Sequence, residues 1–340
     1  MRVAVLGATG AVGRAMLEIL SARVPDVDEV TLLASPTSRG RQLFWAGRER
    51  TVGAPEAGCF RGCRLALFSA GSGVSRDWAP VAAGEGAVVV DNSSAWRMDP
   101  QVPLVVPEVN AERIRERPKG IIANPNCSTI QVALPLKALR DVAGLRRVIY
   151  ATYQSASGAG ERGLRALREE RDARAGPAAN GGRSDGSPFP ARLAGNVIPS
   201  VGSPVDGGWT EEEDKMRAET RKILDMPELP IAATCARVPV AVGHSVAVTV
   251  EMETPLSAEE AARAIAAQPG ACVDARPFGP LALDAAGTDA VHVGRIRLDR
   301  DLPNTIHFWV VADNLRKGAA LNAVQIAEQV LAEAGSGVSA

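Results

Sequence analysis

The chain has 340 residues, more than one simple hydrophobic core requires, and is expected to form two domains. Its composition, 46% hydrophobic and 23% charged, is typical of a soluble globular protein, and a net charge of -1 argues against a nucleic-acid or anionic-membrane partner. No stretch is long and apolar enough to cross a bilayer, and the start has no signal-peptide pattern. The five scattered cysteines favour a reducing cytoplasm and lack the paired spacing of a zinc site, so no metal site is predicted.

A glycine-rich turn follows the first strand pattern. Residues 2–6 form a short, mainly apolar run, and a helical pattern follows the glycines at positions 7, 10 and 13. Gly7 permits a tight turn, Gly10 lets the backbone approach a pyrophosphate, and Gly13 lets the helix pack on the strand. The pyrophosphate would lie at the helix N-terminus. The order of strand, turn and helix therefore favours a dinucleotide site, with simple turn chemistry as the alternative.

The second predicted strand, residues 30–34, ends without the Asp or Glu that binds the ribose of NAD. It continues instead into Ser-Pro-Thr-Ser-Arg-Gly-Arg at positions 35–41. Hydroxyl groups and two arginines suit a ribose 2′-phosphate, so this segment favours NADP over NAD. A solvated loop is the alternative interpretation.

Further buried strands are predicted over residues 65–69 and 87–90, with a helix over 74–83 between them. This alternation indicates a parallel, doubly wound α/β sheet. Arg97 follows the end of a strand, where ligands collect in open α/β sheets, and its guanidinium could bind a phosphate or carboxylate. The alternative is an ordinary surface arginine.

The segment Asn-Pro-Asn-Cys-Ser-Thr, at positions 124–129, lies between an apolar pair and a helical pattern. Pro125 disfavours helical backbone at the residue before it, and Asn126 or Ser128 could cap the helix that follows. Cys127 would then lie at a helix N-terminus, where the dipole and the unpaired N–H groups favour a thiolate and could stabilise an oxyanion. The segment predicts a nucleophile, and the alternative is a small buried cysteine at a turn.

After this helix the pattern changes. A strand is predicted over residues 147–154, ending in a loop of small residues, 155–160, that a ligand could approach closely. A charged helix over 162–174 and a flexible insert over 176–190 are expected next. Thr210 and Glu213 form a capping-box pattern at the start of a further helix. Glu212 and Lys215 share a face of that helix, which could bind a zwitterionic or phosphorylated ligand or be solvated.

Arg237 and His244 precede a strand predicted over residues 246–252, and Pro239 and Gly243 interrupt the extended chain between them. A lone histidine on a strand is more often structural than catalytic, but His244 lies near the strand start and could reach a cleft. The remaining predicted elements are a cap and helix over 254–268, antiparallel strands over 291–298 and 305–312, and a helix over 319–334 that returns to the first domain.

Taken together, the sequence resembles the aspartate-semialdehyde dehydrogenases nearly end to end. The resemblance rests on eight motifs in the order of that family: GATGAVG (7–13), NSSAWR (92–97), NPNCST (124–129), QSASGAG (154–160), EEEDKM (211–216), RVPV (237–240), GHS (243–245) and DNLRKG (313–318). It implies an NADP-binding, Rossmann-like doubly wound domain over 1–128 and 314–340. It also implies an α+β domain for substrate binding and dimerisation over 129–313.

The resemblance implies reversible, NADPH-dependent reductive dephosphorylation of L-4-aspartyl phosphate to L-aspartate 4-semialdehyde through a cysteine thioester. The pathways would be those of lysine and diaminopimelate, threonine and methionine. The chain would act as a cytoplasmic homodimer or homotetramer.

The same resemblance implies roles for individual residues. Cys127 would be the nucleophile, His244 the acid/base, and Gln154 would orient the intermediate. Arg237 would bind the substrate α-carboxylate, and Glu212 its ammonium. The phosphate-binding residues would be Arg97, Asn126 and Lys215. The cofactor-binding residues would be Gly7, Thr9, Gly10, Ala11, Val12, Gly13, Thr37, Ser38, Ser157, Gly158 and Asn314.

Two other functions are compatible with this pattern. N-acetyl-γ-glutamyl-phosphate reductases share the two-domain plan and the cysteine chemistry, but their substrate carries an acetamide and needs no acidic partner. Glu212 with Lys215, and the Gly-His-Ser context of His244, favour the aspartate substrate. A non-catalytic NADP-binding paralogue could lose Cys127 or His244, yet both are present.

Overall fold

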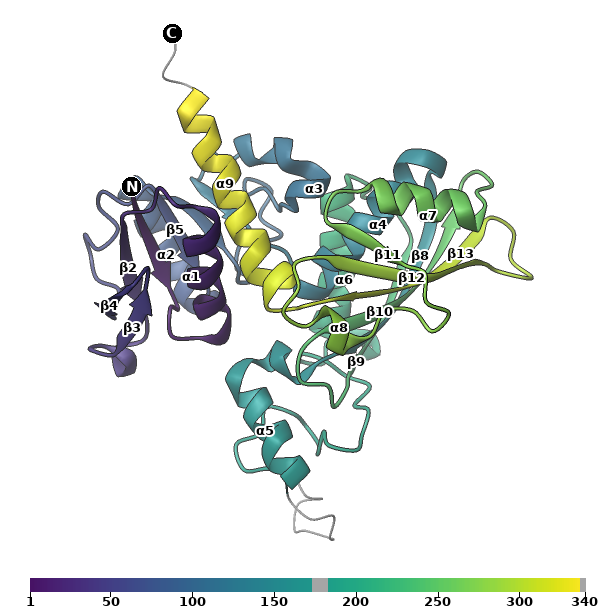
Figure 1. The fold of residues 1–340 in the computed structure, drawn as a ribbon, viewed down its shortest axis with the longest axis horizontal. Helices are drawn as coiled ribbons and strands as arrows, with labels where there is room; N and C mark the ends of the chain where they lie inside the picture. The colour runs from purple at the N-terminus through teal and green to yellow at the C-terminus, as the bar shows by residue number, and fades with distance from the viewer. Residues whose placement is uncertain (173–182, 337–340) are drawn as a thin grey trace. The chain divides into compact units, whose positions relative to one another are not determined.

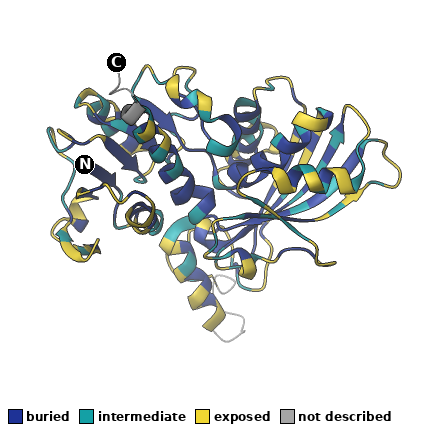
Figure 2. Ribbon diagram, turned by 45° about the horizontal axis from the view of Figure 1, so that its top comes forward, coloured by how far each residue is buried: buried dark blue, intermediate teal, exposed yellow. Residues whose placement is uncertain are grey.

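The computed structural model describes residues 1–172 and 183–336, and the chain divides into two compact units (Figure 1). Unit 1 comprises Met1–Asn126 and Ala319–Ala340, and unit 2 comprises Cys127–Gly318. Each unit has its own main sheet, and the strands of both are largely buried (Figure 2). Residues 176–182 of the predicted insert lie outside the described residues. No helix in the described part combines the length and hydropathy that crossing a membrane requires.

Unit 1 is built on a parallel five-stranded sheet in the order β2-β1-β5-β6-β7. Its strands are β1 (Arg2–Leu6), β2 (Glu29–Leu33), β5 (Leu65–Phe68), β6 (Val88–Asp91) and β7 (Ile121–Ala123). A separate hairpin consists of β3 (Gln42–Trp45) and β4 (Arg48–Thr51). The helical segments are α1 (Ala11–Arg23), η1 (Pro36–Ser38), α2 (Ser72–Gly84), α3 (Pro107–Asn110), η2 (Ala111–Arg115) and α9 (Leu321–Ser336). The predicted doubly wound parallel sheet is confirmed.

The C-terminal helix α9 belongs to unit 1, although the chain passes through all of unit 2 before reaching it. It packs against α1 and β6, and its buried side chains Val324 and Ala327 share one core with Met16 and Leu20 of α1. Burial of this apolar face holds the helix on the unit. The predicted return of the last helix to the first sheet is therefore confirmed.

Unit 2 is built on a mixed six-stranded sheet in the order β11-β12-β13-β10-β8-β9. Its strands are β8 (Leu145–Gln154), β9 (Ile231–Arg237), β10 (His244–Met252), β11 (Ala271–Asp274), β12 (Val291–Leu298) and β13 (Thr305–Ala312). Helices α4 (Cys127–Ala143), α6 (Glu211–Leu224) and α7 (Ala258–Ala267) form a layer on this sheet, with α4 contacting the other two. Val246, Val248 and Val250 of β10 are buried while the residues between them are partly exposed, as expected for a sheet covered by helices on one face.

The remaining helical segments of unit 2 lie between its strands and after the last of them. The segments are η3 (Ala156–Ala159), α5 (Gly160–Asp172), η5 (Asp206–Gly208), α8 (Ala282–Ala285) and the π-helix η6 (Arg316–Ala320), which runs into unit 1. A small core of Ala166, Leu167, Phe189 and Leu193 holds α5 to the loop that follows it.

Most predicted elements of unit 2 lie where the periodicity placed them, but one helix starts later. The expected helix over 254–268 begins at Ala258, because Ser257 and Glu260 form a reciprocal capping box there. The capping box of Thr210 and Glu213 at the start of α6 is present as predicted.

Candidate active site

The glycine turn of unit 1 has no room for larger residues. Gly7 has φ of 90°, and a Cβ atom there would lie 2.3 Å from the carbonyl oxygen of Ser69. A Cβ atom on Gly13 would lie 2.1 Å from the carbonyl oxygen of Gly7. Helix α1 can therefore approach β1 this closely only because residue 13 has no side chain. Gly10 is the N-cap of α1 and supplies no side-chain cap. The N–H groups of the first turn, which includes Ala11 and Val12, can therefore bind an anion.

A pocket of about 540 Å³ lies beside this turn, at the carboxyl ends of β1, β2 and β5. Its lining residues are Leu6, Gly7, Thr9, Gly10, Ala34, Ser35, Pro36, Pro55, Ser69, Ala70, Val74 and Trp78. No carboxylate is among them. Ser35 Oγ lies 2.8 Å from Thr37 Oγ1, and Ser38 Oγ lies 3.5 Å from Thr9 Oγ1, so hydroxyl groups gather where β2 ends. The turn and the pocket therefore fit a dinucleotide.

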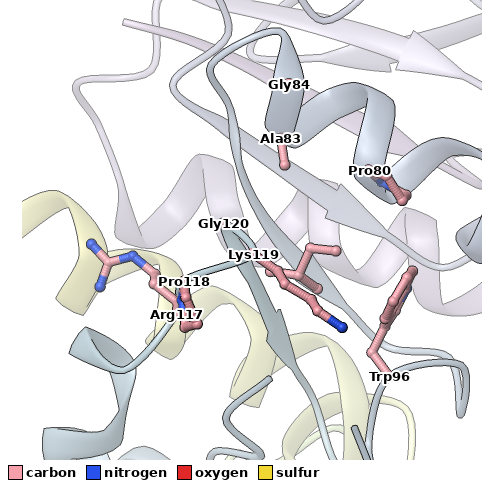
Figure 3. Close-up of a pocket in the computed structure, with 9 residues that line it drawn as sticks. Pro80, Ala83, Gly84, Trp96, Arg117, Pro118, Lys119 and Gly120 are labelled. Carbon is pink, nitrogen blue, oxygen red and sulfur yellow. The ribbon is translucent and has the colours of Figure 1, made fainter. Parts of the chain in front are cut away.

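A second pocket of unit 1, about 670 Å³, is lined by Trp96, Lys119 and the end of α2 (Figure 3). The Lys119 ammonium lies 5.6 Å from the ring centre of Trp96 and forms an ion pair with Asp99. Arg117 is paired with Glu333. The cations of this pocket are thus already neutralised, and no nucleophile lines it, so it is not the candidate reaction site.

Arg97 and the segment before Cys127 are tied together inside unit 1. The Arg97 side chain is buried and donates to the carbonyl oxygens of Asn124 and Asn92, each at 2.9 Å. Asn322 of α9 donates to the Asn124 side chain at 2.7 Å. Asn126 is buried at the end of the same segment. The carboxyl ends of β6 and β7 and helix α9 therefore fix the predicted phosphate-binding residues of this unit.

In unit 2, the sheet brings the other candidate residues together at neighbouring strand ends. Gln154, the last residue of β8, is the register partner of Arg237, the last residue of β9. His244 begins β10, the strand on the other side of β8. Cys127 is the first residue of α4, as predicted, and its Cβ would lie 3.0 Å from a Cβ atom on Gly318. Only a glycine at position 318 lets the backbone pass this close to the cysteine.

His244 is completely buried, and its two ring nitrogens have different surroundings. The backbone N–H of Ser155 donates to Nδ1 at 3.0 Å, and Ser155 Oγ lies 2.9 Å from the same nitrogen. Among the residues that the structure describes, no group forms a hydrogen bond with Nε2. Burial, and then the charge of Arg237, hold the pKa of His244 well below its usual range, so the ring is neutral near pH 7.

Arg237 is buried and faces the same space as His244. Its Nη1 donates to the carbonyl oxygen of Ser155 at 2.8 Å, and its guanidinium lies 5.7 Å from the ring centre of Phe189. Burial lowers the pKa of Arg237, whereas a thiolate at Cys127 and the Glu212 carboxylate raise it. A Cβ atom on Gly158 would lie 2.6 Å from Nη1 of Arg237 and 3.1 Å from Nε2 of His244. The exposed Gly158 therefore leaves open the space that both side chains border.

Helix α6 contributes Glu212 to this group, and Lys215 lies three residues further along the same helix. Glu212 is buried and accepts a hydrogen bond from Gln154 Nε2 at 3.1 Å. Its neighbour Glu213 caps Thr210 and accepts from the Cys235 N–H at 3.0 Å, which ties α6 to β9. The Lys215 side chain is partly exposed and lies 3.6 Å from Glu211, one turn earlier.

Asn314 contacts the loop that holds His244 and joins three segments of the chain. Its Oδ1 accepts from the hydroxyls of Ser155 and Ser157 and from the N–H of Gly243, each at 3.0 Å. These contacts join the end of β8, the turn before β10 and the segment after β13. Asn314 and Ser157 were expected to bind the cofactor; the contacts observed here are with the loop that holds His244.

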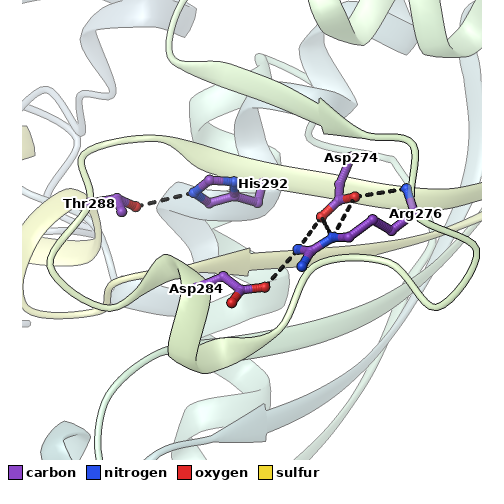
Figure 4. A network of polar contacts seen from close by, with 5 residues as sticks. All are labelled: Asp274, Arg276, Asp284, Thr288 and His292. Atoms are coloured by element: carbon purple, nitrogen blue, oxygen red, sulfur yellow. Dashed lines mark hydrogen bonds and ion pairs between the residues drawn. The ribbon is translucent and has the colours of Figure 1, made fainter.

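A separate polar network lies at β11, α8 and the start of β12 (Figure 4). Arg276 joins Asp274 of β11 to Asp284 of α8, and its hydrogen bonds lower the pKa of the Asp274 carboxyl. His292 contacts Thr288 at 3.1 Å in the same loop region. Helix α8 packs directly on the turn before His244, since a Cβ atom on Gly243 would lie 2.8 Å from the Ala282 carbonyl oxygen. The network therefore joins α8, the helix that contacts this turn, to β11.

The sequence did not identify Ser155 as a residue that positions other groups. It lies in the predicted small-residue loop, but its contacts with His244, Arg237 and Asn314 join residues far apart in the chain. Nor did the sequence identify Ser69, Ala70 and Trp78 as pocket residues. Their only signal was the position of Ser69 and Ala70 at the end of a buried strand.

The comparisons of this chain with known proteins all indicate the same family. The model described as "Semialdehyde dehydrogenase, NAD binding domain" matches residues 2–117, and "Semialdehyde dehydrogenase, dimerisation domain" matches residues 136–317. The chain is 47% identical to an aspartate-semialdehyde dehydrogenase of Aquifex aeolicus, with 98% of each chain covered. It is 44% identical to the corresponding protein of Bacillus subtilis, with 97% of each covered.

Solved structures agree with this result. The chain is similar to aspartate semialdehyde dehydrogenase II of Vibrio cholerae complexed with ASA, with a TM-score of 0.92, 44% identity, and 97% and 98% of the two chains covered. An aspartate semialdehyde dehydrogenase with NADP from Candida albicans has a TM-score of 0.74 at 26% identity, with 96% and 97% covered. The chain is therefore a dehydrogenase that belongs to the aspartate-semialdehyde dehydrogenase family.

Proposed function

We propose that the protein catalyses the reversible, NADPH-dependent reductive dephosphorylation of L-4-aspartyl phosphate to L-aspartate 4-semialdehyde. The main support is the group of Gln154, Glu212, Arg237 and His244, whose side chains meet at the strand ends of unit 2. Cys127, at the head of α4, is within electrostatic reach of Arg237. The names of the relatives at 41–47% identity support the same activity. The pathways would be those that make lysine, threonine and methionine from aspartate.

The cofactor would bind to unit 1 at the glycine turn of residues 7–13 and the adjoining pocket. It supplies the hydride when bound. The N–H groups at the start of α1 would hold its pyrophosphate, since a helix N-terminus attracts anions. Ser35, Thr37 and Ser38 offer hydroxyls at the end of β2, where no carboxylate lies, so we infer a preference for NADP over NAD. Ser157, Gly158 and Asn314 of unit 2 remain proposed cofactor contacts.

Cys127 would act as the nucleophile. Its place at the first position of α4 favours a thiolate, because the helix dipole and the N–H groups of the first turn stabilise negative charge. Attack on an acyl phosphate expels phosphate and forms a thioester, which accepts a hydride more readily than a carboxylate does. Gln154 would orient this thioester, and His244 would act at its carbonyl oxygen.

The charges around the site match the substrate. Arg237 would bind the α-carboxylate as a forked pair, and Glu212 would bind the ammonium group. Arg97, Asn126 and Lys215 would bind the phosphate. A buried carboxylate at Glu212 favours a substrate with an ammonium over one with an acetamide, because an ammonium can form a charge-assisted hydrogen bond with it and a neutral acetamide cannot form an ion pair. This is the observation that favours aspartyl phosphate over N-acetyl-γ-glutamyl phosphate.

Cys127→Ser tests the proposal. We expect the variant to lose nearly all NADPH formation from aspartate semialdehyde and phosphate, while NADPH binding, followed by fluorescence, stays unchanged. Cys272→Ser is the matched control, since Cys272 is exposed and lies on the outer strand β11. Full activity of Cys127→Ser would refute the nucleophile, and equal turnover of N-acetylglutamate semialdehyde would refute the substrate.

We also propose that the protein assembles as a homodimer or homotetramer in the cytoplasm. The family model that matches residues 136–317 carries the description of a dimerisation domain, which supports self-association through unit 2. Sedimentation of the purified protein distinguishes monomer, dimer and tetramer.

A further inference from the structure

The guanidinium of Arg237 is buried, yet few contacts orient it. Arg237 is 8% exposed, and among the residues that the structure describes only the carbonyl oxygen of Ser155 accepts a hydrogen bond from its side chain, at 2.8 Å. A guanidinium has several N–H donors, so most of them remain for a ligand. A single hydrogen bond leaves the plane of the group free to turn, and a second contact is needed to direct those donors.

The ring of Phe189 supplies this second contact. Its centre lies 5.7 Å from Cζ of Arg237, within the distance at which the negative face of an aromatic ring attracts a cation. Phe189 is 4% exposed, and the attraction is stronger where water is excluded. The phenylalanine side chain has no polar atom with which to bind an anionic substrate, so it can act on such a substrate only through Arg237.

The ring cannot retreat from the guanidinium, because α5 lies against its tip. A Cβ atom on Gly163 would lie 3.1 Å from Cζ of Phe189, so the helix approaches the ring closely. Leu167 and Leu193 pack in the same small core as the ring. Arg183 donates to the carbonyl oxygen of Phe189 at 2.9 Å, which holds the backbone as well.

The segment that carries Phe189 is anchored on both of its other sides. The buried carboxylate of Glu170 accepts from the N–H groups of Leu193 at 2.7 Å and Ala194 at 3.0 Å, and hydrogen bonds to a carboxylate are among the strong ones. Ile198 exchanges two backbone hydrogen bonds with Arg237, at 2.8 and 2.9 Å. Residues 183–198 therefore hold the backbone of Arg237 and also supply the ring that faces its side chain.

We infer that Phe189 is a positioning residue of the substrate site, whose negative ring face holds the Arg237 guanidinium in the orientation that receives the α-carboxylate. The inference deepens the proposed function and rests on it for the identity of the carboxylate. Residues 183–198 lie outside the eight sequence motifs, yet they form part of the site. Without the ring, the substrate must order the guanidinium when it binds, and this ordering weakens binding.

Phe189→Leu removes the ring and keeps an apolar side chain. In the assay of NADPH formation from aspartate semialdehyde and phosphate, we expect the KM for aspartate semialdehyde to rise about tenfold. The kcat and the KM for phosphate should stay within about twofold, because only binding of the carboxylate is weakened. The matched control is Phe278→Leu, since Phe278 lies 5.1 Å from the guanidinium of Arg276 in a similar but exposed pair. It should retain the wild-type KM.

A second protein separates the charge of the ring face from its packing. It carries at position 189 a phenylalanine with fluorine on both Cε atoms, which draws electron density from the ring face, nearly keeps its shape and leaves unchanged the tip that meets α5. We expect its KM for aspartate semialdehyde to lie between those of wild type and Phe189→Leu, with wild-type thermal unfolding. A wild-type KM for this protein, or an equal rise in the KM for phosphate in Phe189→Leu, would overturn the inference and leave the proposed activity standing. Absence of turnover by the wild-type protein would instead overturn the proposed function.

Discussion

Gly158→Ala is expected to disable the site without unfolding the protein. A methyl group at this position would lie 2.6 Å from Nη1 of Arg237 and 3.1 Å from Cε1 and Nε2 of His244. Ordinary contacts between heavy atoms lie at about 3.5–4.0 Å, so the guanidinium must retreat by about 1 Å. His244 cannot move as easily, since Ser155 holds its other nitrogen.

A misplacement of about 1 Å at a reacting group can cost about 10²-fold in rate. We therefore expect kcat/KM for aspartate semialdehyde to fall about 100-fold, which is about 2.7 kcal/mol of transition-state stabilisation. Stability should change by no more than about 1 kcal/mol, because Gly158 is exposed, its backbone is not left-handed, and the gain from restricting the unfolded chain offsets the weakened contact of Arg237 with Ser155.

The assay is NADPH formation in the presence of phosphate, with thermal unfolding measured on the same samples. Gly84→Ala is the matched control, because Gly84 is also exposed and a Cβ atom there would meet nothing within 4 Å. It should retain wild-type kcat/KM. A folded Gly158→Ala protein with near wild-type kcat/KM would show that Arg237 and His244 do not work in the arrangement described.

Three further outcomes are expected. Thr210→Ala removes the side-chain cap of α6 and should lower the free energy of unfolding by about 1 kcal/mol, measured by urea denaturation; no change would contradict the cap. In a Cys272→Ser background, iodoacetamide at pH 8 should modify Cys127 and leave Cys235 unmodified, because burial raises the pKa of Cys235 to about 12; mass spectrometry of peptides decides this. The hydrogen bond from His307 lowers the pKa of Asp299 to about 2, so the carboxylate stabilises the fold above about pH 4 and loses this effect as the pH falls toward 2. Asp299→Asn should accordingly be less stable than wild type at pH 6, with a gap that narrows below pH 4 in thermal unfolding.

Local patterns predicted the fold well where a single physical rule governs each element. Strands β12 and β13 lie at the residues given by their alternation, and α6 begins at the predicted capping box. The start of α7 was predicted too early because two cap signals stand close together: Thr254 before a proline, and Ser257 three residues before Glu260. The reciprocal hydrogen bonds between Ser257 and Glu260 decide where the helix starts. The sequence alone gave no way to rank the two cap signals.

The candidate site was predictable only in part, because its reactive residues carry local signals and its positioning residues do not. Cys127 begins α4 because a proline-containing turn precedes it, which is visible in the sequence. Asn314 lies 159 residues from Ser155, and only the pairing of β8, β10 and β13 brings them together. A serine in a loop of small residues has no property that distinguishes a positioning role from simple flexibility.

The spacing of Arg237 and His244 shows how the sheet resolves an ambiguity of the sequence. An uninterrupted strand would direct them to opposite faces, but β9 ends at Arg237 and β10 begins at His244, so each lies at the end of its own strand. Both strands pair with β8, and the residue after β8 connects them: the carbonyl oxygen of Ser155 accepts from Arg237, and its N–H donates to His244. The two peptide groups that flank Ser155 thus set the positions of the Arg237 and His244 side chains. Because these are backbone contacts, Ser155→Ala should preserve them and reduce activity far less than Gly158→Ala, which displaces the side chains themselves.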